Sequence, residues 1–169
     1  MLKKPRILIW IAFIIALGTA GLMFFHYQYD PCDQMSLGVI VDSDRGRLYL
    51  CENQKSFESF SVSLGRGGIE KRAEGDNRTP IGTYSLASPR SSKSFYKFIP
   101  VGYPTSAQVQ SGFTGGAIGI HGPVRGNKIW SWPVSLVDWT RGCIAVATDE
   151  QITFIADWIE EKKVSIGRF

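Results

Sequence analysis

The fold is decided by the stretch Gly38-Val-Ile-Val-Asp42, Ser43-Asp-Arg-Gly46 and Arg47-Leu-Tyr-Leu-Cys-Glu52. The first segment is apolar enough for a short strand, and the third has the period of two that is typical of a half-buried strand. The middle segment is a turn between them. A second turn at residues 53–55 leads into a third strand over residues 57–64. Three short strands joined by tight turns predict an antiparallel meander.

Further strands and one helix are expected in the rest of the domain. Strands are predicted over residues 94–101 and 117–120, with a closing strand over 164–166. Thr148 and Gln151 form a capping box that starts the helix. Its apolar side chains then fall on one face: Ile152, Ile155, Ala156 and Ile159. The sequence therefore predicts a mainly β domain, as a mixed sheet or a sandwich, with one C-terminal helix.

The composition is that of a single globular domain. The chain has 169 residues, of which 44% are hydrophobic and 20% charged, and this is too apolar for a disordered polypeptide. A net charge of +4 is too weak to indicate nucleic-acid binding, and no such partner is expected. Three cysteines and two histidines are too few for a zinc finger or a cysteine-rich scaffold, so no metal is expected.

The N-terminus predicts an exported domain. Residues 7–25 contain a single polar side chain, and a helix of this length spans about 28 Å, close to the thickness of a bilayer core. The basic leader at residues 1–6 keeps the N-terminus in the cytoplasm. We therefore predict a transmembrane anchor over 7–25, a tether over 26–36 and the working domain over 37–169. A cleaved signal peptide, with small residues at 18–20, is the alternative.

The residues suited to catalysis lie between positions 118 and 146. A cysteine becomes a nucleophile when an imidazole shares or accepts its proton, and His121 and Cys143 can form such a pair on neighbouring strands. Gly142 allows close approach of a substrate and leaves the amides of Arg141, Gly142 and Cys143 free for an oxyanion hole. The carbonyl of Gly122, which the following proline holds extended, is expected to accept a hydrogen bond from the second imidazole nitrogen.

Two segments together resemble the signature of the L,D-transpeptidase catalytic domain, Ile120-His-Gly-Pro123 and Thr140-Arg-Gly-Cys-Ile144. Three upstream segments resemble the first half of the same family, especially the murein L,D-transpeptidases of the bacterial envelope: Val62-Ser-Leu-Gly65, Glu74-Gly-Asp-Asn-Arg-Thr-Pro80 and Gly82-Thr-Tyr84. The resemblance extends over residues 37–169, and it implies the L,D-transpeptidase type of β fold.

The resemblance implies acyl transfer on peptidoglycan stem peptides, with no cofactor and no metal. Cys143 would attack the carbonyl of the L-centre residue, usually meso-diaminopimelate, and release the terminal D-alanine, while His121 acts as base and then as acid. The thioester would pass to an amine of a second stem peptide, of an anchored protein or of a free D-amino acid, or to water. The domain would then lie on the outer side of the cytoplasmic membrane in a bacterial envelope.

Two other functions fit the same residues. One is a hydrolase on this scaffold, either an L,D-carboxypeptidase or an amidase that releases wall-linked protein, because water can replace the amine without any new side chain. The other is a non-catalytic wall-binding module, although binding alone requires neither His121 nor Cys143.

Substrate-binding positions are expected at four residues. Thr140 matches the Ser/Thr position of the family and orders its loop. Arg141 stands where many members have a second His, and it either binds a stem-peptide carboxylate or stays solvated. Arg78 positions the carboxylate end of the peptide or braces its own loop. Trp130 is expected either to stack against substrate or to pack within the protein.

The remaining cysteines and two further tryptophans are expected to be structural. Cys32 and Cys51 form a disulfide in an oxidising envelope or, because Cys32 lies in the tether, stay apart; in either case Cys143 is free. Trp139 and Trp158 are expected in the core.

Overall fold

The computed structural model describes residues 30–125 and 137–169. Its compact unit begins at Pro31, rather than at Leu37 where the sequence places the start of the domain. The predicted membrane anchor over 7–25 lies outside the described residues. Within the described ranges, no helix is both long and apolar enough to cross a membrane.

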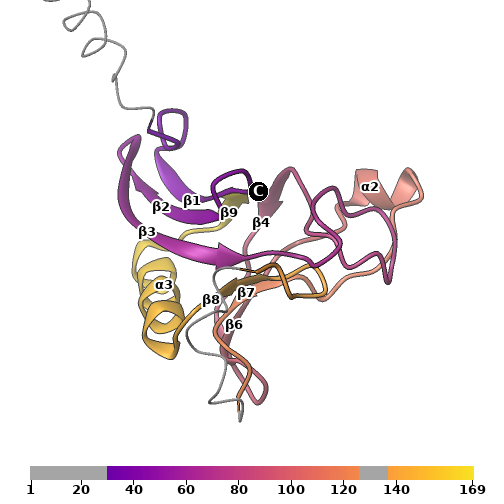
Figure 1. Cartoon of the computed structure of the whole chain (residues 1–169). Coiled ribbons are helices and arrows are strands. Elements are labelled where there is room, and N and C mark those ends of the chain that lie inside the picture. The colour runs from indigo at the N-terminus through magenta and orange to yellow at the C-terminus, as the bar shows by residue number, and fades with distance from the viewer. Residues whose placement is uncertain (1–29, 126–136) are drawn as a thin grey trace, which may run out of the picture. The chain divides into compact units, whose positions relative to one another are not determined.

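One sheet of nine strands organises the described part of the chain, in the order β4-β9-β1-β2-β3-β8-β7-β6-β5 (Figure 1). The strands are β1 (Leu37–Asp42), β2 (Arg47–Glu52), β3 (Lys55–Ser63), β4 (Thr83–Ser85), β5 (Arg90–Ser92), β6 (Tyr96–Pro100), β7 (Gly119–His121), β8 (Ile144–Val146) and β9 (Ile166–Arg168). Two labelled helices accompany them, α2 (Ser106–Gln110) and α3 (Asp149–Lys162). The sheet is mixed, because β1–β9 and β7–β8 are parallel while the other pairs are antiparallel. The predicted fold class, mainly β with a C-terminal helix, is confirmed.

The predicted meander lies at the centre of this sheet. β1 pairs antiparallel with β2, and β2 pairs antiparallel with β3. The end of β3 does not pair with β2. Its residues Val62 and Ser63 pair with Val146 and Ala145 of β8. β3 therefore connects the meander to the β6–β8 strands (Figure 1).

The two faces of β1 pack into different clusters. Val39 and Val41 lie in the main core, whereas Ile40 between them packs with Cys32 and Cys51. Because alternate side chains of a strand point to opposite faces, the run of apolar residues in β1 reflects burial on both sides.

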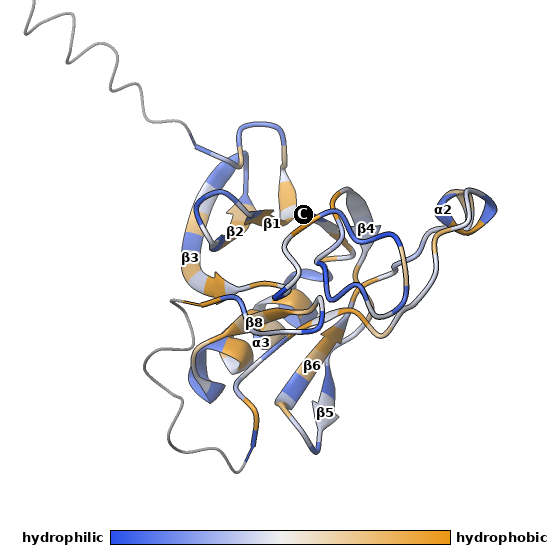
Figure 2. Ribbon diagram, turned by 45° about the vertical axis from the view of Figure 1, so that its right-hand side comes forward, coloured by the Kyte–Doolittle hydropathy of each residue, from blue (hydrophilic) through white to orange (hydrophobic). Residues whose placement is uncertain are grey.

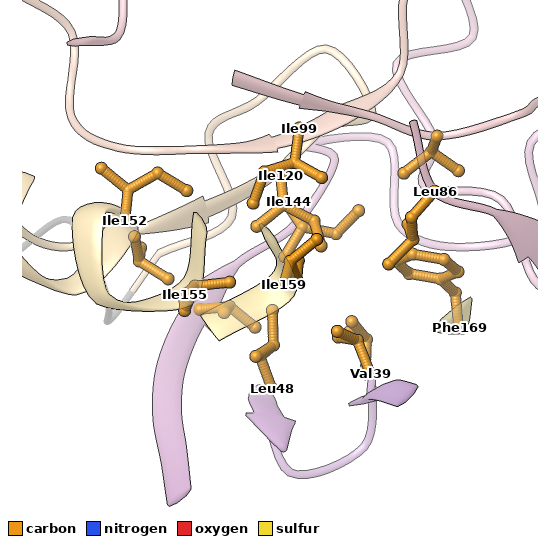
Figure 3. Close-up of a cluster of buried hydrophobic side chains, with 14 of the residues drawn as sticks. Val39, Leu48, Leu86, Ile99, Ile120, Ile144, Ile152, Ile155, Ile159 and Phe169 are labelled. Atoms are coloured by element: carbon orange, nitrogen blue, oxygen red, sulfur yellow. The ribbon is translucent and has the colours of Figure 1, made fainter. Parts of the chain in front are cut away.

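The helix α3 covers the main core. Ile152, Ile155 and Ile159 are buried on one of its faces, as predicted. Figure 3 shows these side chains beside Leu48 of β2 and beside residues of β6, β7 and β8, namely Ile99, Ile120 and Ile144. Burial of an isoleucine stabilises the fold by about 1.5–3 kcal/mol, so this face holds α3 against the strands that carry the candidate site.

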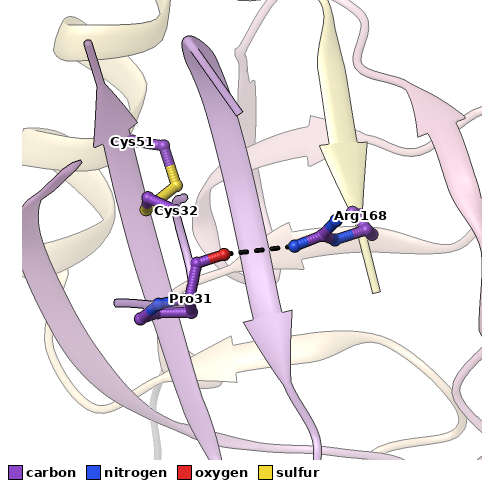
Figure 4. Close-up of a disulfide and its surroundings, with 4 residues drawn as sticks. All are labelled: Pro31, Cys32, Cys51 and Arg168. Atoms are coloured by element: carbon purple, nitrogen blue, oxygen red, sulfur yellow. Dashed lines mark hydrogen bonds between the residues drawn. A yellow bond between two sulfur atoms is a disulfide. The ribbon is translucent and has the colours of Figure 1, made fainter. Parts of the chain in front are cut away.

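A disulfide ties the start of the compact unit to the sheet. Cys32 and Cys51 are bonded and fully buried (Figure 4). Beside them, the guanidinium of Arg168 donates a hydrogen bond to the carbonyl of Pro31 at 3.1 Å. Residues 31–36, expected to belong to the tether, therefore belong to the folded unit, because a covalent bond and burial of apolar surface hold them there.

Short elements differ most from the expectations. β9 begins at Ile166, where the predicted closing strand ends, and α2 and β5 have no counterpart among the predicted elements. None of the residues of α2 is buried, and it extends away from the sheet as a mostly hydrophilic segment (Figure 2). Elements of three to five residues are too short to show a hydrophobic period.

The start of α3 is capped by a variant of the predicted capping box. The hydroxyl of Thr148 accepts a hydrogen bond from the Gln151 amide at 3.2 Å. The Gln151 side chain accepts from the amide of Ala147 at 3.0 Å, rather than from that of Thr148. The first bond satisfies an amide of the first helical turn, and the second satisfies the amide of the residue before the cap.

Candidate active site

Neighbouring parallel strands bring His121 and Cys143 together. In the register of β7 and β8, His121 lies opposite Ala145, so Cys143 comes opposite Gly119. Because alternate residues of a strand share a face, His121 and Cys143 lie on the same side of this ladder. Both line one cleft of about 720 Å³, called the Cys143 cleft below.

Three aromatic rings surround the imidazole of His121, which is only 1% exposed. The Phe95 ring stacks on it with centroids 3.9 Å apart, and the Phe98 ring is also stacked at 6.2 Å. The ring of Trp139 lies in a T-shaped arrangement with the imidazole, with the two ring centroids 6.0 Å apart. Gly119 makes room for this arrangement, because a β-carbon there would overlap the Phe98 ring.

A hydrogen bond determines the tautomer of His121. Its Nδ1 lies 2.7 Å from the carbonyl oxygen of Gly122. A carbonyl oxygen only accepts, so Nδ1 carries the proton and Nε2 presents a lone pair. Burial lowers the pKa of His121 to about 4, although the Gly122 carbonyl acts in the opposite direction. At neutral pH the imidazole is therefore uncharged and able to accept a proton.

The thiol of Cys143 is also protonated at neutral pH. Its Sγ donates to the carbonyl of Ala117 at 3.5 Å. Burial raises the pKa of the Cys143 thiol. The hydrogen bond from the Gly119 amide and the charge of Lys71 both lower this pKa, but the effect of burial is larger. The resting pair is thus a thiol and a neutral imidazole, rather than a thiolate and an imidazolium.

Thr140 orders the loop that precedes Cys143. Its hydroxyl donates to the carbonyl of Cys143 at 2.7 Å and accepts from the amide of Gly142 at 3.0 Å. This bond uses the single N–H of Gly142, so that amide is not free for an oxyanion, contrary to the prediction. The amides of Arg141 and Cys143 have no acceptor within the described part of the chain. They are the amides left for an oxyanion hole.

The backbone conformation at residue 142 requires a glycine. Its φ of +120° is a conformation that L side chains rarely adopt, and a β-carbon would overlap the carbonyl oxygen of Arg78. The guanidinium of Arg78 points along its own loop, where it donates to the carbonyl of Ile69 at 3.5 Å, and it does not line the Cys143 cleft. Of the two roles expected for Arg78, this hydrogen bond favours bracing of its own loop.

The aromatic residues beside His121 are not predicted from the sequence. Phe95 and Phe98 belong to the predicted strand over 94–101, and Trp139 is expected in the core, whereas in the structure it lines the cleft. Phe95 and Phe98 reach the site because β6 pairs with β7, with Phe98 opposite His121, and Trp139 precedes β8, the other neighbour of β7. Local spacing shows neither pairing. Trp158 is buried, as expected.

Trp130 lies outside the described residues, so its role, stacking on substrate or packing, stays a prediction. Arg141 is exposed and lines the Cys143 cleft.

Comparison with known families gives one match that covers most of this domain. Residues 37–166 match the YkuD family, described as the L,D-transpeptidase catalytic domain. The chain belongs to this family. The resemblance drawn from the sequence motifs is thereby confirmed. A comparison with the curated proteins finds none that matches the sequence.

Solved structures with this L,D-transpeptidase fold include two larger proteins. The helical cell shape determining protein Pgp2 from Campylobacter jejuni is 27% identical with a TM-score of 0.62, over 77% of this chain and 46% of that one. Bd1075 from Bdellovibrio bacteriovorus is 19% identical with a TM-score of 0.57, over 79% of this chain and 47% of that one, which shows the fold alone. The chain thus spans about half the length of either protein.

A buried ion pair holds the loop that contacts Gly142 in this L,D-transpeptidase domain. Lys71 Nζ lies 2.7 Å from Asp76 Oδ1, and the Lys71 side chain is 4% exposed. Asp76 also accepts hydrogen bonds from three amides of the loop, those of Arg72, Ala73 and Arg78. Burial alone would raise the pKa of Asp76, but these amides and the ammonium group hold it well below its usual range. The pair therefore helps to position the Arg78 carbonyl against Gly142.

Proposed function

We propose that this chain is a peptidoglycan L,D-transpeptidase that acts through a thioester on Cys143. The observation that carries the proposal is the hydrogen bond from His121 Nδ1 to the Gly122 carbonyl, which leaves Nε2 as a proton acceptor in the cleft that Cys143 lines. Family membership supports the reaction class. Pgp2 determines helical cell shape, which agrees with a substrate in the cell wall.

Acylation starts from the neutral pair. Cys143 Sγ attacks the carbonyl carbon of the L-centre residue of a stem peptide, usually meso-diaminopimelate, while its proton passes to Nε2 of His121. A C–S bond forms, and the carbonyl oxygen becomes an oxyanion that the amides of Arg141 and Cys143 stabilise. The C–N bond then breaks, the departing amine of D-alanine takes the proton from His121, and a thioester remains on Cys143.

Deacylation repeats these steps with a new nucleophile. An amine of a second stem peptide, of an anchored protein or of a free D-amino acid attacks the thioester carbonyl. His121 takes a proton from the attacking amine and returns it to the sulfur of Cys143 as the C–S bond breaks. Water in place of the amine gives L,D-carboxypeptidase activity with the same residues.

Because peptidoglycan lies outside the cytoplasmic membrane, the proposal includes the side of the membrane on which the catalytic domain lies. The catalytic domain works on the outer side of the cytoplasmic membrane, and the anchor predicted over residues 7–25 holds it there. Protease added to intact spheroplasts should digest a C-terminal tag on the chain, and protection of the tag until lysis would contradict this orientation.

Mass spectrometry of the products tests the reaction. The full chain in detergent, incubated with disaccharide tetrapeptide, should release D-alanine and give a covalent adduct on Cys143. Cross-linked or exchanged products support transfer, whereas trimmed products alone support the carboxypeptidase. Cys143→Ala should give neither adduct nor product, and His121→Gln should lower the rate by about a thousandfold. If Cys143→Ala and the wild type gave the same products, both enzymatic functions would be excluded.

A further inference from the structure

Two arginines lie side by side at the Cys143 cleft. Gly65 and Thr140 form a parallel bridge, in which the amide of Arg66 donates to the carbonyl of Thr140 at 2.9 Å. Arg66 and Arg141 are the next residues on these two bridged segments, so they are neighbours in space. Both side chains line the cleft that contains Cys143.

The charges of Arg66 and Arg141 are not compensated by the protein. Neither guanidinium forms an ion pair within the described ranges, and none of the described residues that line the cleft is acidic. Like charges that lie close together repel each other, and a bound anion would relieve this repulsion. A third arginine of the cleft, Arg90, lies instead over the ring of Phe98 at 5.1 Å. Arg66 and Arg141 are therefore the pair left for an anionic ligand.

We infer that Arg66 and Arg141 form a carboxylate-binding site that selects donor peptides by the free carboxylate of the leaving residue. A guanidinium binds a carboxylate with two parallel hydrogen bonds, and two guanidiniums can bind both of its oxygens. This inference rests on the proposed function, because it adds donor selection to the same cleft.

The position of Arg141 relative to the chemistry favours this assignment. Arg141 is two residues before Cys143, and its own amide is a candidate for the oxyanion hole. In the donor, the carboxylate of the leaving residue is separated from the scissile carbonyl carbon by only three covalent bonds. The guanidinium of Arg141 and its neighbour Arg66 are thus suited to this carboxylate while the carbonyl is held at Cys143.

Two donors that differ only in this carboxylate provide the test. Acylation of Cys143 is measured with a stem tetrapeptide and with its C-terminal carboxamide, for the wild type, Arg66→Gln, Arg141→Gln and the double variant. The wild type should prefer the free acid by about tenfold to a hundredfold in kcat/KM, and the double variant should lose this preference. Arg45→Gln is the matched control, because Arg45 is exposed, pairs with Asp42 and does not line the cleft. It should keep the wild-type preference.

Binding without chemistry separates this inference from the proposed function. In calorimetry, the Cys143→Ala chain should bind the free acid more tightly than the amide, and the added Arg66→Gln and Arg141→Gln changes should remove the difference. If the wild type acylates acid and amide equally, or the double variant keeps the preference, the carboxylate site is excluded while the transpeptidase stands. If the wild type acylates neither donor but Cys143→Ala still discriminates, the site stands and the proposed function fails.

Discussion

The carbonyl oxygen of Arg78 lies directly against Gly142, so that there is no space for a β-carbon at residue 142. Through this contact, the loop braced by Lys71 and Asp76 supports the backbone just before Cys143. The position of Cys143 therefore depends on residues that do not line the Cys143 cleft.

Replacing Gly142 should therefore impair catalysis without unfolding the protein. Gly142→Ala introduces an unfavourable φ, at a cost of about 1–3 kcal/mol, and pushes the Arg78 carbonyl away. We expect the acylation rate of Cys143 to fall by about a hundredfold, because small displacements of reacting groups have effects of this size. Gly68→Ala is the matched control, since Gly68 has a φ of +89° but no atom within 4 Å of the added carbon. Equal rates in the two variants would show that the contact with Arg78 is unimportant.

Removing the charge of Asp76 should destabilise the protein far more than removing that of an exposed carboxylate. Asp76→Asn leaves the buried ammonium of Lys71 without a counter-ion, and we expect a loss of about 3 kcal/mol in the free energy of unfolding by urea. Asp157→Asn breaks the ion pair between Lys97 and the exposed carboxylate of Asp157. This change should lower the free energy of unfolding by less than about 1 kcal/mol.

The pH dependence of Asp76 follows from the direction of its shift. Because its pKa is lowered in the folded state, its contribution is present above about pH 4 and is lost as the pH falls further. The difference between wild type and Asp76→Asn should shrink below pH 4, and a constant difference would contradict the assigned shift.

His121 should make the protein less stable in mild acid. Its pKa is about 4 in the folded state and about 6.5 when unfolded, so between these values only the unfolded chain takes up the proton. The free energy of unfolding should therefore fall as the pH drops from 6.5 to 4, by about 2 kcal/mol at pH 5. Urea unfolding of wild type and His121→Gln at pH 7 and pH 5 measures this contribution. The same pH dependence in both proteins would refute it.

Cys143 should react with iodoacetamide as a thiol of raised pKa. The labelling rate of the folded protein should keep rising beyond the ordinary thiol value of about pH 8.5, and at pH 8 it should be lower than that of the chain unfolded in urea. Labelling that already reached its plateau by pH 7 would instead indicate a thiolate–imidazolium pair in the resting enzyme.

Reduction of the disulfide should destabilise the compact unit. Cys32 and Cys51 are 19 residues apart, and a crosslink of this span stabilises a fold by about 3 kcal/mol. Dithiothreitol should lower the free energy of unfolding of the wild type by this amount. It should leave Cys32→Ala unchanged, because that variant has no disulfide to reduce. A response of equal size in the two proteins would show that the reagent acts elsewhere.

Local patterns were sufficient to predict the meander, the helix α3, the family and the pair His121 and Cys143. The period of two in β2, the capping residue Thr148 and the spacing of the motifs all lie within short windows, so they appear directly in the order of residues.

The surroundings of that pair were decided only by the tertiary structure. Phe95 and Phe98 reach His121 because β6 pairs with β7, and Trp139 reaches it beside β8, the other neighbour of β7. Their burial of the imidazole produces a neutral base beside a neutral thiol. The contact of Arg78 with Gly142 likewise joins residues far apart in the chain. Desolvation and close packing depend on which segments become neighbours in space, and no short window of sequence contains that information.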